Sequence, residues 1–189
     1  MSNLRRMCLI IGLVSMAAWA TPELLPTRST IATEALQAAL EAERTYKIPG
    51  KVLLAIMADV VEAEHGDRAW INELTADDLK IQRDGRFGLM GLTGWDAAHC
   101  FAHDLQTARG QVLCFAEQLS GVVRYPEAVW QKLGGSTRAN DDFLKFVREL
   151  VAFKQACDAR YDALGQRKNP VVVRVCGVPP QPPLPKNSQ

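Results

Sequence analysis

The sequence predicts an all-α protein, and three stretches of residues 29–164 carry this prediction. The first is alanine-rich with apolar residues at helical spacing, the second is apolar on most faces, and the third is a long periodic run near the C-terminus. Glycines and prolines separate such runs. The β-branched residues 171–175 (VVVRV) would add at most one short strand. The chain has a formal net charge of +1, and nothing in it suggests the clustered basic face of a nucleic-acid binder.

Residues 1–20 show the three-part pattern of a secretory signal peptide. Arg5 and Arg6 precede a short apolar run, and residues 18–20 (AWA) supply a small-x-small cleavage site. The run is shorter than the roughly 20 apolar residues that a membrane helix needs. Cys8 lies inside the run and not after the cleavage site, so we expect no lipid anchor. We therefore expect a periplasmic or secreted protein that has no membrane span after cleavage.

Four cysteines remain in the expected processed chain: Cys100, Cys114, Cys157 and Cys176. An even number in an exported protein predicts two disulfides, and four cysteines allow three pairings. Proximity in the sequence favours Cys100–Cys114 and Cys157–Cys176. Alternatively, Cys114 is a small core residue of its apolar run.

The first helices follow from local signals. Residues 21–28 contain two prolines and predict an extended leader. Residues 29–46 predict a helix that Ser29 or Thr30 can cap. After a break at Pro49, residues 51–65 are apolar on most faces, which is typical of a buried, central helix.

Residues 65–87 are polar and predict a long excursion with one helical turn near residues 75–80, and such stretches are often functional. Four further helices are expected near residues 94–103, 106–120, 125–133 and 140–164, punctuated by Gly110, Gly121 and Gly134. These elements define one domain over residues 29–165. Residues 166–189 are expected to form a C-terminal extension with a proline-rich, extended tail.

Three segments, in order, resemble the lytic transglycosylase family of lysozyme-fold enzymes. Residues 48–66 (IPGKVLLAIMADVVEAEHG) resemble the proline-started helix that ends in the family's catalytic glutamate. Residues 84–98 (DGRFGLMGLTGWDAA) resemble its Gly-Leu-Met-Gln turn and the following helix. Residues 104–119 (DLQTARGQVLCFAEQL) are similar to a helix with glycine before a bulky apolar pair. The resemblance covers roughly residues 48–153.

The resemblance implies a lysozyme-like helical domain whose cleft takes the glycan strands of peptidoglycan, without a metal or a cofactor. Family members cleave the MurNAc–GlcNAc bond with one glutamate and leave a 1,6-anhydro sugar. That acid must still hold its proton near neutral pH, so burial has to raise its pKa above ~4.3. The substrate-binding residues implied here are Gly88, Leu89, Met90, Gly91 and Thr93.

The sequence departs from the family pattern at the polar cleft positions. Aligned from Ile48 without a gap, the catalytic position falls on Val60. The candidates are Glu62, which follows a valine as the family's glutamate does, and Glu64, which shares a helix face with Val60. The alternative for both glutamates is a solvated, acidic helix end. Gly91 replaces the family's glutamine, and residues 132–133 (KL) replace its Tyr-Asn pair.

Because these positions depart together, we expect a degenerate lytic transglycosylase, a pseudoenzyme that binds glycan strands or an envelope or secretion-system partner with weak or no cleavage. The alternative is an active enzyme with Glu64 or Glu62 as its single acid/base. A third hypothesis, an exported helical domain unrelated to glycans, requires the Gly-Leu-Met match to be chance.

Histidines and tryptophans supply the remaining candidates. His99 and His103 are four residues apart and would share a helix face, as metal ligands do, but no third ligand is evident and we expect surface residues. Three tryptophans have faces that suit sugar rings, although burial is the commoner outcome: Trp70, Trp95 and Trp130.

Overall fold

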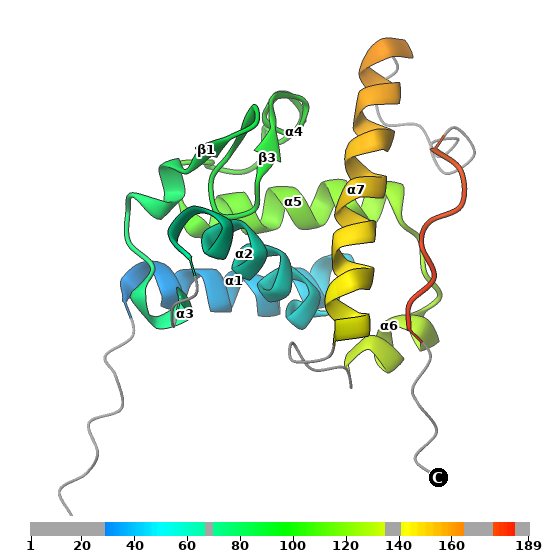
Figure 1. Cartoon of the computed structure of the whole chain (residues 1–189), viewed down its shortest axis with the longest axis horizontal. Helices are drawn as coiled ribbons and strands as arrows, with labels where there is room; N and C mark the ends of the chain where they lie inside the picture. The colour runs from blue at the N-terminus through cyan, green and yellow to red at the C-terminus, as the bar shows by residue number, and fades with distance from the viewer. Residues whose placement is uncertain (1–28, 67–69, 135–140, 165–175, 184–189) are drawn as a thin grey trace, which may run out of the picture.

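The computed structural model describes residues 29–66, 70–134, 141–164 and 176–183 (Figure 1). The expected signal peptide, the leader, the strand at residues 171–175 and the end of the tail lie outside the described residues. What is described is mostly helical, with one small sheet.

Helix α1, Thr30–Tyr46, begins and ends at local signals. The side chain of Ser29 accepts a hydrogen bond from the Ala32 amide at 3.0 Å, which confirms the expected cap. Lys47 ends the helix in the left-handed conformation. One face of α1 is buried through small side chains: Ala32, Ala35, Ala38, Ala39 and Ala42. Their size lets α5 and α2 approach the α1 backbone closely, and α1 packs against both.

Helix α2, Gly50–His65, is the predicted buried helix, and its burial confirms that prediction. Eight of its residues are buried: Gly50, Val52, Leu53, Ala55, Ile56, Met57, Ala58 and Val61. Its last turn extends beyond the core, so Ala63, Glu64 and His65 are exposed.

The stretch after α2 contains structure that the sequence analysis missed. After the short helices α3, Trp70–Glu73, and η1, Asp78–Lys80, an antiparallel sheet follows with strands β1, Gln82–Arg83, β2, Arg86–Phe87, and β3, Leu92–Thr93. Asp84 and Gly85 connect β1 to β2 with positive φ angles of 51° and 74°. Two such residues make the turn typical of tight hairpins, for which Asp-Gly is a strong signal. The loop prediction was wrong for residues 82–87.

The four predicted C-terminal helices are present: α4, Gly94–His99, α5, Ala108–Val122, α6, Glu127–Gly134, and α7, Asp141–Leu164. Helix α4 is shorter than expected and ends before Cys100. Gly110 and Gly121 lie within α5 and do not end it. A side chain at Gly110 would collide with the backbone of Asp104, 1.8 Å from its carbonyl oxygen, so the close approach of the preceding loop requires glycine there.

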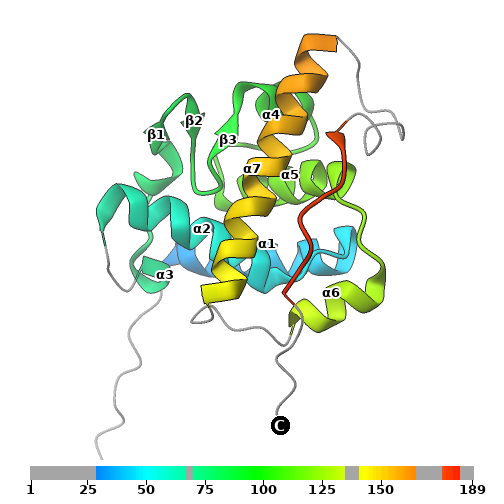
Figure 2. The ribbon, with the colours of Figure 1, turned by 45° about the vertical axis from the view of Figure 1, so that its right-hand side comes forward.

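Two views show how these elements are arranged (Figures 1 and 2). Helices α1 and α5 lie side by side, α2 lies against α1, and α7 rises steeply beside α2. The hairpin stands on the other side of α2 from α7, and residues 176–183 run beside α7 toward α6. Within the described residues, no helix has the length and apolarity that crossing a bilayer requires.

Both expected disulfides are present. Cys100 is bonded to Cys114 across 5.5 Å between Cα atoms and ties the end of α4 to α5. Cys157 is bonded to Cys176 across 4.9 Å and ties α7 to the C-terminal segment. Both separations are ordinary for disulfides.

Candidate functional site

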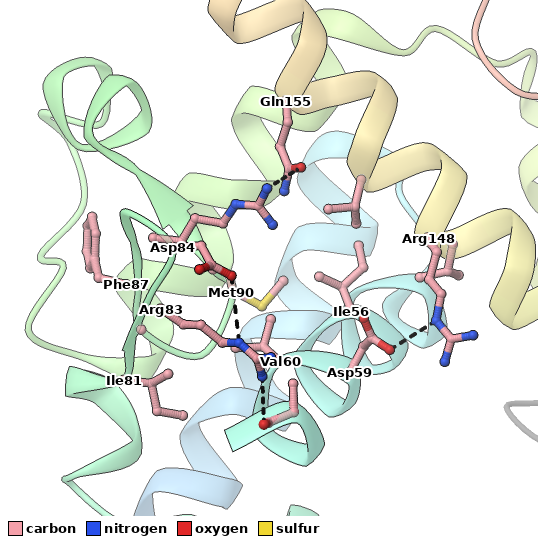
Figure 3. Close-up of a pocket in the computed structure, with 16 residues that line it drawn as sticks. Ile56, Asp59, Val60, Ile81, Arg83, Asp84, Phe87, Met90, Arg148 and Gln155 are labelled. Carbon is pink, nitrogen blue, oxygen red and sulfur yellow. Dashed lines mark hydrogen bonds and ion pairs between the residues drawn. The ribbon is translucent and has the colours of Figure 1, made fainter. Parts of the chain in front are cut away.

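A groove runs between the hairpin and α7, with α2 as its floor (Figure 3). Its cavity measures about 240 Å³. The floor is largely apolar and includes Ile56, Val60 and Met90, whereas charged side chains from the hairpin and α7 stand along the walls. Segments far apart in the sequence therefore meet around one hollow that is apolar below and polar at its edges.

The Gly-Leu-Met turn forms part of this groove, and a buried glutamine holds it in place. Gln111, on α5, is fully buried, and its Oε1 accepts a hydrogen bond from the Leu89 amide at 2.8 Å. Its Nε2 donates to the carbonyl oxygens of Leu79 and Leu105, both at 2.9 Å. A Cβ atom at Gly88 would lie 2.2 Å from Gln111 Oε1, and Gly88 has φ +71°. Glycine is required at residue 88 by both the close approach and the backbone conformation.

Val60 faces Gly91 on the floor of the groove. A Cβ atom at Gly91 would lie 3.3 Å from Val60 Cγ2, and Gly91 also has a positive φ, +57°. Both residues line the cavity. These are the two positions at which the resemblance implies a catalytic glutamate and a glutamine. In this chain the two positions hold a valine and a glycine, which offer neither a proton nor a side-chain hydrogen bond.

Neither Glu62 nor Glu64 lines the groove. Glu64 is exposed on the last turn of α2, and Glu62 is half-buried. Ala63, which lies between them in the sequence, lines the groove instead. Its backbone carbonyl oxygen accepts a 2.7 Å hydrogen bond from Arg83 Nη1. Glu64 shares a helix face with Val60, which made it a candidate, but it is not buried. From residue 63 on, α2 extends past the edge of the core.

The carboxylates that do line the groove are Asp59 and Asp84. Asp59 Oδ1 pairs with Arg148 Nε of α7 at 3.2 Å, and the two side chains are 51% and 64% exposed. Asp84 pairs with Arg83 in the hairpin at 3.7 Å. Both carboxylates are solvent-exposed, and each has a guanidinium partner.

Arg86 and Gln155 connect the two walls. Arg86 Nη2, on the hairpin, donates to Gln155 Oε1, on α7, at 2.7 Å, and the bond spans the groove (Figure 3). None of the groove's arginines was predicted from the sequence as a site residue. The Asp-Gly signal could have placed Arg83 and Arg86 on a hairpin, and the seven-residue spacing of Arg148 and Gln155 puts them on one face of α7. That this face meets the hairpin is a tertiary contact without a local signal.

The other predicted site residues are dispersed. Leu89 is buried beneath the turn, and Thr93 caps α4 by accepting from the Asp96 amide at 3.2 Å. Trp95 stacks on His99 with ring centroids 4.1 Å apart, whereas His103 Nε2 lies 3.0 Å from Glu117 Oε2. The two histidines thus do not share a helix face, because α4 ends between them.

Aromatic side chains other than Phe87 are absent from the described lining of the groove. Trp130 is buried and packs edge-on against Tyr125 with centroids 4.9 Å apart. The side chain of Trp70 lies outside the part of the chain that the structure describes.

Comparisons with protein-family models, with curated proteins and with solved structures find no match to the chain.

Proposed function

We propose that this protein is an exported, degenerate lytic transglycosylase of lysozyme-like fold that binds peptidoglycan glycan strands in the periplasm, or after secretion, with weak or no cleavage. The observation that carries the proposal is that Val60 and Gly91 lie next to each other on the floor of the groove. The groove keeps its supporting turn, but apolar groups occupy the positions where the resemblance implies catalytic chemistry.

The lining of the groove suits a sugar ring. Pyranose rings have apolar faces and polar edges, so a bound ring can rest on the half-buried Val60 and Phe87 while its hydroxyl groups meet charged and amide side chains. Arg148 and Gln155 supply such groups from α7, and the hairpin supplies others. Sites of this kind place a few polar groups around a largely apolar concavity.

Cleavage needs more than this groove provides. A single glycosidic acid has to retain its proton in a half-dry cleft until the leaving oxygen takes it. Asp59 is half exposed and ion-paired, and Asp84 is 84% exposed. Glu62 and Glu64 lie outside the groove lining. Binding without turnover is the activity that these positions support.

The test combines sedimentation with product analysis on purified sacculi. We expect the wild-type protein to co-sediment with sacculi and to release no anhydro-muropeptides detectable by mass spectrometry. Val151→Trp would fill the groove from α7 and reduce co-sedimentation, because Val151 is a half-buried lining residue. Ala128→Trp adds the same side chain at an exposed position of α6 outside the groove and should leave co-sedimentation unchanged.

Two outcomes would contradict the proposal. Release of anhydro-muropeptides that Glu64→Gln or Glu62→Gln abolishes would establish the active enzyme and identify its acid. If the protein neither releases anhydro-muropeptides nor co-sediments with sacculi, the glycan strand is excluded as ligand. That result would favour an envelope or secretion-system protein as the partner.

A further inference from the structure

A buried cluster of three charged side chains lies between α7 and α4, apart from the groove. Lys154 Nζ is 2.6 Å from Asp96 Oδ1 and 2.5 Å from Asp158 Oδ2. The three side chains are only 1%, 1% and 3% exposed, in that order. The ring of Phe115 adds an apolar wall, with its centroid 5.2 Å from Nζ.

The cluster is an incomplete salt bridge. One ammonium faces two carboxylates, and Asp158 Oδ1 is buried without a hydrogen-bond partner in the part of the chain that the structure describes. Buried charges are costly unless they are neutralised, and a buried, unpartnered polar atom calls for an explanation. Burial raises the pKa of Asp158 from 3.8 to about 6, while the charges of Lys154 and His99 act in the opposite direction. Asp158 is therefore suited to take up and release a proton.

We propose that Lys154 and Asp96 join through an intramolecular amide bond, with Asp158 as the residue that carries the proton. The amine nitrogen is already in hydrogen-bond contact with the carboxyl group that it would attack. Holding two reacting groups together in this way removes much of the entropic cost of the reaction. The product also replaces two buried charges with a neutral amide.

The bond forms by loss of one water molecule. Lys154 Nζ passes a proton to Asp158, and the resulting amine attacks Cγ of Asp96. The C–N bond forms, the bond from Cγ to Oδ1 breaks, and Oδ1 leaves as water with two protons that came from the ammonium, one of them delivered by Asp158. One hydrogen stays on the amide nitrogen, and Asp158 returns to its starting state.

Asp96 rather than Asp158 is the carboxyl group positioned for attack. Asp96 Oδ2 accepts hydrogen bonds from the Thr93 amide at 2.7 Å and from the Thr93 hydroxyl at 2.9 Å. Two fixed donors on that oxygen would stabilise the negative charge that develops on it in the tetrahedral intermediate. Among the described residues, Asp158 makes the lysine contact on Oδ2 and has no hydrogen-bond partner on Oδ1, which leaves that oxygen available to hold a proton.

The bond would fasten α7 to α4. Helix α7 forms one wall of the groove, and its next turn carries the Cys157–Cys176 disulfide. A covalent link at Lys154 would fix that wall against the rest of the fold in an exported protein. The inference does not depend on what the groove binds.

Peptide mapping of the purified, folded protein tests the bond. After reduction, alkylation and tryptic digestion, we expect residues 87–109 and 149–160 in one branched peptide whose mass is the sum of the two less one water. Trypsin would not cleave after Lys154, because its amine is acylated. In Asp158→Asn we expect the link to be lost and residues 149–154 and 155–160 to appear separately.

Asp77→Asn is the matched control, because it removes a carboxylate from the exposed ion pair with Lys80 and should keep the link. A wild-type protein with free 87–109 and 149–154 peptides overturns the proposal. A water loss confined to residues 149–160 overturns the choice of Asp96, and an undiminished link in Asp158→Asn overturns the role of Asp158.

Discussion

Two buried polar clusters in this protein differ in how completely their polar atoms are paired. The cluster around Gln111 is neutral, and its amide bonds three backbone groups of the loops that bear the groove. The cluster around Lys154 is charged, brings two carboxylates to one amine and leaves one carboxylate oxygen without a partner among the described residues. A neutral cluster whose hydrogen bonds are all made holds the backbone in place. A buried charged cluster that lacks one hydrogen-bond partner is costly, and its groups can still react. The first holds the turn in place through its hydrogen bonds, and the second is where we expect chemistry.

The largest effect is expected at the turn itself. Gly88→Ala would place a methyl group on Gln111 Oε1 in a left-handed backbone conformation, which displaces the glutamine and breaks its bonds. We expect the free energy of unfolding to fall by about 4 kcal/mol, measured by urea denaturation. Gly85→Ala is the matched control, because Gly85 has φ +74° but open space around it, and it should cost only about 1 kcal/mol. Equal losses in the two variants would show that Gln111 does not restrain the turn.

Removing only the hydrogen-bonding groups of Gln111 should lower the free energy of unfolding somewhat less than Gly88→Ala does. Gln111→Leu keeps a side chain of similar size but leaves the Leu89 amide and the carbonyl groups of Leu79 and Leu105 without their partner. We expect a loss of about 3 kcal/mol in the free energy of unfolding. Amide exchange of Leu89 should accelerate at the same time. Unchanged protection of that amide would contradict the assigned role of the glutamine.

The charged cluster should make stability depend on pH. While Lys154 is still a free ammonium, burial raises the pKa of Asp158 to about 6 in the folded protein, so the folded state binds the proton more tightly than the unfolded state does. This contribution is fully present below pH 3.8 and is lost as the pH rises through about 6, a fall of about 3 kcal/mol at most. Urea denaturation across this range measures the slope. Asp158→Asn should remove this part of the slope, and the slope rather than the absolute stability is the readout because this variant also loses the proposed proton carrier.

The smallest effect is expected at the exposed ion pair on the rim of the groove. Asp59→Asn weakens the pair with Arg148, which solvent screens, so the free energy of unfolding should change by less than about 1 kcal/mol. Binding to sacculi measured on the same variant separates stability from function. A loss of stability as large as that of Gln111→Leu would mean that the rim, and not the buried glutamine, holds the groove together.

Much of the helical framework could be predicted because its signals are local. The cap at Ser29, the alanine face of α1 and the apolar run of α2 each reflect contacts that the helix pattern itself encodes. The disulfide pairing followed from short sequence separation. The hairpin at Asp84 and Gly85 was missed although its turn signal was present, because two-residue strands are too short to show an alternating pattern.

The sequence by itself determined where helices begin, which faces are apolar and which cysteines lie close enough to pair. Only the tertiary structure decided that Val60 lies next to Gly91, that Glu64 is not part of the groove lining and that Lys154 is buried between two carboxylates. The physical reason is how far apart in the sequence the interacting residues lie. Periodicity and capping involve residues within a few positions of one another, whereas the groove and the buried cluster join side chains from separate helices whose approach depends on the packing of the whole core.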